Sequence, residues 1–488
     1  MEKRFIFVNI SIESGYNSGV NHGIAYLTPI LKRHSYEVTC LNIRLDISEK
    51  NFIDKIEDFK PSIVGFSCTS HQLKYLVKYS KGLEGYPQIL QIAGGVGPTL
   101  DPEWVLNRSG VHGVCIGEGD IPLNNLLNNI DNKQDVFDTE GFYWRINGRI
   151  KKNDVSPFVS DLSTLDFPDY TIFERKVVAW GDNLFIMLSR GCPFDCYYCC
   201  NRALSERYSD SNKYFRLPSV QHSIRLLEGL LEQHPETKFI TFEDDLLIAN
   251  KAWFEGFAEE FNKRIGLPYR ICARPEYINP GIVAALKSSG CKWVFIGLES
   301  GNEYLRGHFL NRKYTNRVFI EKSMMIKNAE IYLFTFNIVG FPYETKEQME
   351  DTFQLNREIG PNHGVCTFFY PYKHTALYKI CEENNLLKSE DEMLQITNYN
   401  TKPSIKMSAE QERDCIYFQK KIKRYLDKQG YLTKMANLPF GITKCFVSIF
   451  YYANSYLYST PLLKRILWRV FQLSGINNMV SRLVGRLK

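Results

Sequence analysis

Three cysteines on one short loop carry the clearest chemical signal in the sequence. Cys192, Cys196 and Cys199 follow a C-x3-C-x2-C spacing within S-R-G-C-P-F-D-C-Y-Y-C-C-N (189–201), directly after the apolar run 184–188. A [4Fe-4S] cluster normally takes four cysteine ligands, so binding by this loop alone leaves one iron open to a ligand other than protein. An open iron is a place for chemistry and not only for electron storage.

The spacing C-x3-C-x-aromatic-C, with Tyr198 as the aromatic residue, resembles the signature of the radical S-adenosylmethionine (SAM) enzymes. The resemblance implies that Cys192, Cys196 and Cys199 hold the cluster, with Tyr198 beside SAM. It also implies that SAM chelates the open iron and is cleaved by one electron to a 5'-deoxyadenosyl radical. The alternative is a zinc knuckle that uses Cys200 or a distant cysteine, but structural zinc sites usually pair two such halves and the sequence shows no second half.

The composition indicates a globular protein with reduced thiols. The 488 residues allow two or three domains, and 44% apolar with 23% charged residues is an ordinary globular balance. Thirteen cysteines, three of them at a ligand spacing, favour thiols kept reduced in a cytosol over a disulfide scaffold. The sequence shows no signal h-region and no apolar run long enough to span a bilayer, so we expect a cytoplasmic protein.

The N-terminal third alternates strands and helices. Candidate strands are 4–10, 36–43, 62–66, 89–93 and 114–116, and candidate helices are 24–33, 52–58 and 73–83. This alternation predicts a Rossmann-like, doubly wound domain over residues 1–140, with ligand loops at the carboxyl ends of its parallel strands.

Three glycine- and serine-containing segments in this domain are similar to the cobalamin (B12)-binding domain fused ahead of many radical SAM cores. They are P-S-I-V-G-F-S (61–67), A-G-G-V-G-P-T (93–99) and I-G-E-G-D (116–120). The resemblance implies cobalamin contacts from Ser67, Gly94, Gly95, Thr99, Gly117 and Glu118. No histidine lies in a D-x-H-x-x-G motif, so the lower axial ligand is missing, and Gly97 stands where relatives often have a histidine. The alternative is a Rossmann-like scaffold that has lost cobalamin.

Residues 141–175 are expected to link two domains. The stretch G-F-Y-W-R-I-N-G-R-I predicts a hairpin around Asn147-Gly148, and a proline-marked irregular segment follows.

Residues 176–385 predict a partial (β/α)6 barrel of the TIM type, with strands at 183–189, 238–243, 268–273, 293–299, 332–339 and 365–370. A helix is expected to open at Pro218. Because chemistry in such barrels lies at the carboxyl ends of strands, polar residues there are candidates. The resemblance implies SAM contacts from Asp244 or Asp245 and from Glu299 (in G-L-E-S-G). By its position after the third strand, Arg274 suits a SAM carboxylate or a substrate anion, with an exposed cation as the alternative, and Gly340 after the fifth strand suits close backbone approach to the adenine of SAM. Arg216 resembles a recurrent basic position after the cysteine loop, with a surface arginine as the alternative.

The C-terminal segment 386–488 is expected to form a helical domain, with an amphipathic helix at 411–428. The formal net charge is +6, and residues 430–488 carry eight Lys or Arg and no Asp or Glu, which leaves about −2 (6 minus 8) for the rest. This basic, aromatic tail predicts a lid over the substrate channel, an interfacial contact with anionic lipid, or a cap with a solvated basic face. Nucleic acid is not expected as a partner, because no known binding module is evident.

Together these features predict a cobalamin-dependent radical SAM enzyme, and foremost a methyltransferase acting on an unactivated carbon of a small or lipid-like metabolite. A non-methylating radical reaction, such as oxidative cyclisation, ring contraction or carbon-carbon coupling, is the alternative among enzymes. A cobalamin or iron-sulfur sensor without turnover is the alternative of another class. Expected partners are the substrate, an electron donor such as flavodoxin or ferredoxin, and the inner face of a membrane.

Overall fold

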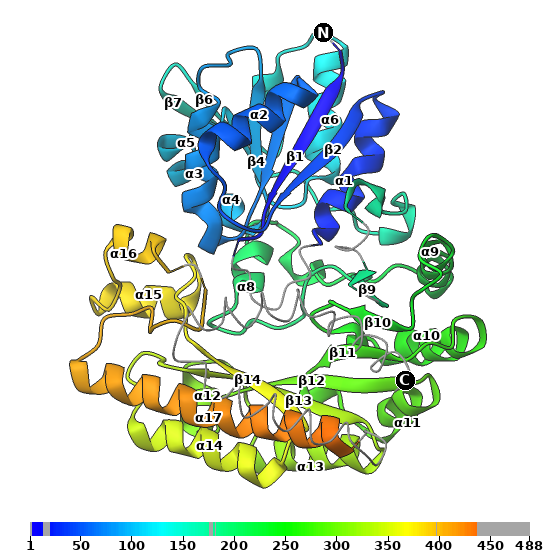
Figure 1. Cartoon of the computed structure of the whole chain (residues 1–488), viewed down its shortest axis with the longest axis vertical. Coiled ribbons are helices and arrows are strands. Elements are labelled where there is room, and N and C mark those ends of the chain that lie inside the picture. The colour runs from blue at the N-terminus through cyan, green and yellow to red at the C-terminus, as the bar shows by residue number, and fades with distance from the viewer. Residues whose placement is uncertain (1, 13–19, 175–178, 181, 397, 437–488) are drawn as a thin grey trace, which may run out of the picture.

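Two seven-stranded sheets organise the chain. The computed structural model describes residues 2–12, 20–174, 179–180, 182–396 and 398–436. In Figure 1 the N-terminal sheet lies above the second sheet, and the short helix α8 (Cys200–Ser205), which follows the cysteine loop, lies between them.

The N-terminal sheet confirms the predicted doubly wound domain. Its strand order is β2-β1-β3-β4-β5-β6-β7; β1 to β5 are parallel, and the β6–β7 hairpin continues the sheet in antiparallel pairing. The strands are β1 (Arg4–Ile10), β2 (Glu37–Ile43), β3 (Ile63–Ser67), β4 (Leu90–Gly94), β5 (Gly113–Cys115), β6 (Phe142–Ile146) and β7 (Arg149–Lys152). The helices are α1 (His22–Arg33), α2 (Glu49–Phe59), α3 (Leu73–Gly82), α4 (Val96–Leu100), α5 (Pro102–Arg108) and α6 (Asp120–Asp131).

The apolar run of β1 explains why this sheet carries helices on both faces. Phe5 and Phe7 pack into one core cluster, while Ile6 and Val8 pack into another. Successive side chains of a strand point to opposite faces, so a continuous apolar run is buried only when both faces are covered.

The second sheet confirms the predicted partial barrel. Its order is β14-β13-β12-β11-β10-β9-β8, with β9 to β14 parallel and β8 (Ala179–Trp180) antiparallel at one edge. The parallel strands are β9 (Asn183–Ile186), β10 (Phe239–Phe242), β11 (Tyr269–Ala273), β12 (Cys291–Glu299), β13 (Tyr332–Val339) and β14 (His363–Phe368). The helices are α9 (Val220–Gln233), α10 (Lys251–Arg264), α11 (Pro280–Ser288), α12 (Glu303–His308), α13 (Asn316–Asn328) and α14 (Lys346–Ile359).

The helix expected to open at Pro218 begins two residues later. Ser219 is the N-cap of α9, and its side chain accepts the backbone N–H of His222. A serine cap satisfies a free N–H of the first turn, which the preceding proline cannot do. The Pro218 carbonyl instead accepts the indole N–H of Trp253 at 2.6 Å.

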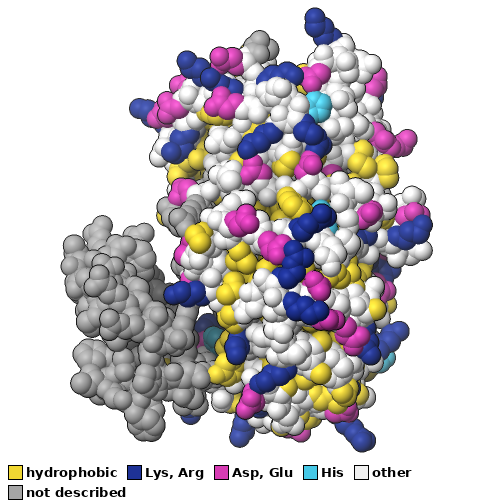
Figure 2. Space-filling view, turned by 90° about the vertical axis from the view of Figure 1, so that its right-hand side faces the viewer, with side chains coloured by type: hydrophobic (Ala, Val, Ile, Leu, Met, Phe, Trp, Pro, Cys, Tyr) yellow, Lys and Arg dark blue, Asp and Glu magenta, His cyan; other side chains and the backbone are white. Residues whose placement is uncertain are grey.

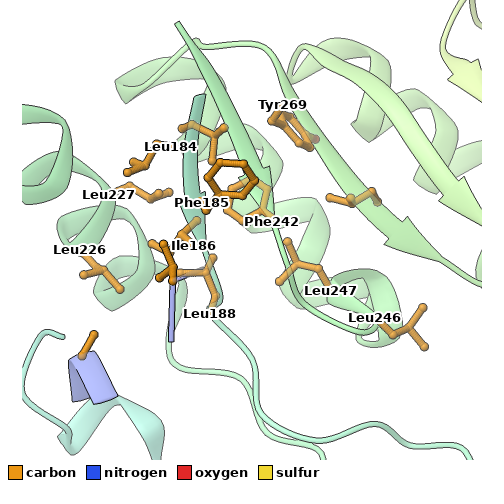
Figure 3. Packing of buried hydrophobic residues seen from close by; sticks show 14 of the residues in the cluster. Leu184, Phe185, Ile186, Leu188, Leu226, Leu227, Phe242, Leu246, Leu247 and Tyr269 are labelled. Carbon is orange, nitrogen blue, oxygen red and sulfur yellow. The ribbon is translucent and has the colours of Figure 1, made fainter. Parts of the chain in front are cut away.

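Strand β9 anchors the cysteine loop to the barrel core. Figure 3 shows the apolar side chains of β9 and the residues just after it between those of α9 and those of β10. Leu184, Ile186 and Leu188 are buried, as are Leu226 and Leu227 of α9. Each fully buried leucine or isoleucine stabilises the fold by about 1.5–3 kcal/mol, so the start of the loop is firmly held.

Helices follow the barrel, as predicted for the C-terminal segment. They are α15 (Ala376–Glu383), α16 (Glu390–Leu394) and α17 (Ala409–Ala436). Phe418, Ile422 and Leu426 of α17 pack against Cys366 and Phe368 of β14, so the amphipathic helix expected at 411–428 covers the outer face of the last strand. The tail 437–488, to which the lid and membrane expectations apply, lies outside the described residues.

Charges are mixed over the surface of the described part. Figure 2 shows Lys and Arg interspersed with Asp and Glu on one face, with hydrophobic side chains in small groups. Among the described residues, no helix combines the length and the apolar character needed to cross a bilayer.

Candidate active site

A cavity of about 380 Å³ lies where the loops after the N-terminal strands meet the cysteine loop. All six residues predicted to contact cobalamin line it: Ser67, Gly94, Gly95, Thr99, Gly117 and Glu118. Ser189, Arg190, Gly191, Asn201 and Asp245 contribute to its lining from the barrel domain. The fold therefore brings the predicted cobalamin contacts together with Asp245 and with both ends of the segment 189–201, whereas the three cysteines and the other predicted SAM contacts are not part of this lining.

Two glycines shape the N-terminal wall of this cavity. Gly95 has φ 91°, and a Cβ atom there would lie 3.0 Å from the Cys68 carbonyl oxygen and 3.1 Å from Ser67 Oγ. Gly117 has φ 82°, where a Cβ atom would clash with the hydroxyl of Tyr208. Only glycine suits such positions, because the backbone has positive φ and neighbouring protein atoms occupy the space of a side chain; these two glycines therefore fix the shape of the cavity wall.

The cysteine loop provides three partly or fully buried thiols. Burial raises the pKa of Cys192 to about 12 and also raises that of Cys196; a hydrogen bond with Cys200, together with burial, raises the pKa of Cys199. Arg274 Nη1 donates to Cys196 Sγ at 2.9 Å. The guanidinium of Arg274 stabilises the thiolate form of Cys196, which burial disfavours. A bound metal would stabilise the thiolate further. This donor set fits a metal cluster.

Glu299 has an uncommon backbone conformation at the end of β12. Its φ is 63°, and the pairing of β12 with β13 shifts register between Gly297 and Glu299. A non-glycine residue in this region costs on the order of 1–3 kcal/mol and is found preferentially at functional sites. The bulge therefore marks Glu299 as a candidate functional residue, and its SAM contact stays a prediction.

Arg312 joins Glu299 to Tyr198. Its Nη1 donates to Glu299 Oε1 at 2.6 Å and to the Tyr198 hydroxyl at 2.9 Å, and its side chain is buried. Sequence reasoning missed this residue, because it lies in an irregular segment after α12 and belongs to no motif. Two residues predicted to contact SAM are thus held together by a third that was not predicted.

The adjacent acids after β10 have different surroundings. Asp244 is buried, and its Oδ1 accepts the backbone N–H groups of Leu188 (3.0 Å) and Ser189, so it fixes the turn into the cysteine loop. Asp245 lies in the cavity wall and accepts Asn201 Nδ2 at 2.9 Å. Both alternatives for the SAM amino group therefore stay predictions: Asp245 faces the cavity, and the buried Oδ2 of Asp244 has no hydrogen-bond partner among the described residues.

Gly340 begins a tight turn after β13. Its φ is 82°, and its N–H donates to Glu344 Oε2 at 2.6 Å. Burial raises the pKa of Glu344 to about 8, so this carboxyl is largely protonated at neutral pH. Glu344 was not predicted; a glutamate at the start of a helix is ordinarily assigned to solvent.

Two family models match the chain. Residues 186–355 match the Radical SAM superfamily, and residues 10–127 match the B12 binding domain. The chain belongs to the B12-binding radical SAM enzymes.

Relatives and one solved structure agree with this assignment. An uncharacterized methyltransferase of Pyrococcus horikoshii is 25% identical over 75% of this chain and 79% of that protein. The anaerobic magnesium-protoporphyrin IX monomethyl ester cyclase of Rubrivivax gelatinosus is 25% identical over 73% of this chain and 65% of its own length. The structure of the radical SAM methyltransferase TsrM from Kitasatospora setae is similar in fold, with a TM-score of 0.63 and 15% identity over 80% of this chain and 79% of that chain.

Membership of the family implies three cofactors: a [4Fe-4S] cluster, SAM and cobalamin. The residues of this radical SAM enzyme fit them, because the loop thiols suit the cluster and the glycine-walled cavity beside them suits the corrin. The relatives and the solved structure named above are enzymes, and none of them supports the sensor alternative. The individual residue roles remain predictions.

Proposed function

We propose that this radical SAM enzyme transfers a methyl group to an unactivated carbon of a small or lipid-like substrate. The observation that carries the proposal is the cavity between the domains, whose lining combines the glycine loops of the B12 domain with residues 189–191 and 201 at the two ends of the cysteine-loop segment. A radical generator and a methyl donor must both reach one substrate, and a cavity beside the cysteine loop would allow that. The methyltransferase relative from Pyrococcus horikoshii and the fold likeness to TsrM support it.

The chain's own residues would bind and orient the cofactors. Cys192, Cys196 and Cys199 would hold the cluster, and Tyr198, Asp244 or Asp245, Arg274, Glu299 and Gly340 would surround SAM. When bound, the cluster and SAM supply a 5'-deoxyadenosyl radical and cobalamin supplies the methyl group. The protein then contributes positioning and the exclusion of water, for which a cavity between two domains is suited.

A non-methylating reaction remains the second candidate, because the cyclase relative is as similar in sequence as the methyltransferase. The two candidates differ in their products from SAM. Methyl transfer consumes a SAM molecule as the methyl source and releases S-adenosylhomocysteine, whereas a cyclisation converts SAM only to 5'-deoxyadenosine and methionine.

The test is anaerobic incubation of the reconstituted protein with hydroxocobalamin, a one-electron reductant, methyl-deuterated SAM and a small-molecule extract. We expect 5'-deoxyadenosine and S-adenosylhomocysteine together, with the labelled methyl group in an extract compound detected by mass spectrometry. Formation of 5'-deoxyadenosine without S-adenosylhomocysteine would favour the non-methylating reaction. Absence of both would contradict radical SAM chemistry.

Two contacts belong to the same proposal. We expect a flavodoxin or ferredoxin to deliver electrons, and the basic tail 430–488 to touch anionic lipid at the inner face of a membrane. The eight positive charges without a single acid in that tail support the second contact.

A further inference from the structure

A buried ion cluster joins the B12 domain to the cysteine loop. Arg190 Nη1 donates to Glu118 Oε2 at 2.8 Å and to Asp120 Oδ2 at 2.6 Å, and its Nη2 donates to Asp120 Oδ1 at 3.1 Å. Arg216 donates to both carboxylate oxygens of Glu118, to Oε2 at 3.2 Å. Two positive and two negative charges therefore balance across the boundary between the domains.

Burial makes each member of this cluster depend on the others. The exposed side-chain fractions are 6% for Arg216, 7% for Asp120, 15% for Glu118 and 16% for Arg190. Water hardly screens charges in such surroundings, and removal of one partner leaves a buried charge without compensation. This cluster is thus unlike the exposed ion pairs of the surface, most of which contribute little.

On the N-terminal side, the cluster is attached to the cavity wall. Glu118 lies between Gly117 and Gly119, which line the cavity. The Gly117 N–H donates to Thr99 Oγ1 at 3.1 Å, and the Glu118 N–H donates to the Tyr208 hydroxyl at 2.7 Å. A ligand resting on Gly117 or Thr99 therefore also restricts Glu118.

On the barrel side, the cluster is attached to the cysteine loop. Arg190 precedes Cys192 by two residues, and Arg190 and Arg216 exchange backbone hydrogen bonds of 3.0 and 2.9 Å. The ring of Tyr26, in α1, lies 4.9 Å from the Arg190 guanidinium. The guanidinium is held on several sides, so a displacement of Glu118 would be passed to the peptide leading into Cys192.

We propose that Glu118, acting through Arg190, is a positioning residue that couples occupancy of the corrin cavity to the placement of the cysteine loop. Sequence resemblance makes Glu118 a cobalamin contact, whereas its carboxylate is engaged by two arginines of the barrel domain. The proposal goes beyond methyl transfer, because it rests on corrin binding in the cavity and not on which reaction follows.

Hydrogen exchange read by mass spectrometry tests the coupling. The full chain with its cluster reconstituted is compared anaerobically with and without hydroxocobalamin. In the unmodified protein, corrin should slow exchange in residues 93–99 and, about tenfold, in residues 187–201. In Glu118→Gln, protection of 93–99 should remain while protection of 187–201 is lost.

Glu103→Gln is the matched control, because Glu103 pairs with Lys152 at 2.5 Å within the B12 domain and is exposed. This variant should behave as the unmodified protein.

Asp120→Asn, which weakens only the contacts to Arg190, gives a second variant should Glu118→Gln fail to fold. The double variant Glu118→Gln/Arg190→Gln should lose no more coupling than Glu118→Gln alone. Protection of 187–201 in Glu118→Gln and Asp120→Asn as strong as in the unmodified protein would overturn the proposal, as would a cysteine loop that does not respond to corrin in the unmodified protein.

Discussion

At the scale of single residues, the thiol of Cys196 and the guanidinium of Arg274 define the most chemically specific contact of the site. The 2.9 Å hydrogen bond joins a cysteine found by its spacing to an arginine found by its position after a strand. Both features were visible in the sequence, but only the fold shows that they meet.

Cys196→Ala should abolish the iron-sulfur absorbance after reconstitution and reduce SAM cleavage to background. Two cysteines of the loop cannot hold three corners of a cluster. The measurement is the visible spectrum together with 5'-deoxyadenosine formation. Cys40→Ala, in β2 of the other domain, is the control and should retain both signals; a normal spectrum in Cys196→Ala would show that the ligand set is misassigned.

Glu344 predicts a specific pH dependence of stability. Its pKa is about 8 in the folded protein against 4.5 for an ordinary glutamate, so folding takes up a proton between these values. The stabilisation is complete below pH about 4.5 and is lost as the pH rises through about 8. A shift of this size corresponds to a few kcal/mol.

Glu344→Gln keeps an acceptor for the Gly340 N–H and does not titrate. Its thermal midpoint relative to the unmodified protein should therefore rise between pH 5 and pH 8.5. The exposed Glu347→Gln on the same helix is the control and should show a constant difference. Parallel pH profiles for Glu344→Gln and the unmodified protein would refute the assignment.

At the scale of elements, the turns at strand ends matter more than the strands themselves. Gly117→Ala should weaken hydroxocobalamin binding by at least about tenfold, because a methyl group at φ 82° would clash with the Tyr208 hydroxyl and move the cavity wall. An absorbance titration measures the affinity. Gly148→Ala has a similar φ of 77° but no atom within 4 Å of the added carbon, so its affinity should be unchanged. Equal affinity of the two variants would exclude a role for the Gly117 turn.

Strands and helices were predictable because their apolar runs are long and periodic. Ile6 and Val8, for example, belong to an unbroken apolar stretch that only a doubly covered strand explains. The start of α9 was misplaced by two residues, because Pro218 and Ser219 are both good opening residues and Ser219 is the N-cap in the structure.

Long-range polar contacts were beyond sequence reasoning. Glu118 lies 72 residues before Arg190 and 98 residues before Arg216 in the sequence, yet it forms an ion pair with each of them. Nothing in the local spacing of charges says which acid a given arginine will reach after folding. Arg312 escaped notice for the same reason.

At the scale of the whole molecule, the basic tail 430–488 predicts binding to membranes that contain anionic lipid. The full chain should bind vesicles containing anionic lipid at low ionic strength and dissociate as salt is raised, because each Lys or Arg near the surface contributes about 1 kcal/mol that salt screens. Replacing Lys464, Arg465 and Arg469 by Gln should weaken co-sedimentation severalfold, whereas exchanging Lys313, Lys322 and Lys346 should not. Equal binding of both triple variants would argue against a lipid contact of the tail.

The hairpin β6–β7 closes one side of the N-terminal sheet, and its outer strand reads Arg149-Ile150-Lys151-Lys152. An outer strand presents unpaired peptide groups, which in many proteins recruit another chain into a growing sheet. Arg149, Lys151 and Lys152 place charged side chains along this strand, and charged side chains on an edge strand disfavour pairing with another chain. Concentrated solutions of the protein should therefore not aggregate through this edge strand, whereas neutral substitutions of Arg149, Lys151 and Lys152 should promote such aggregation.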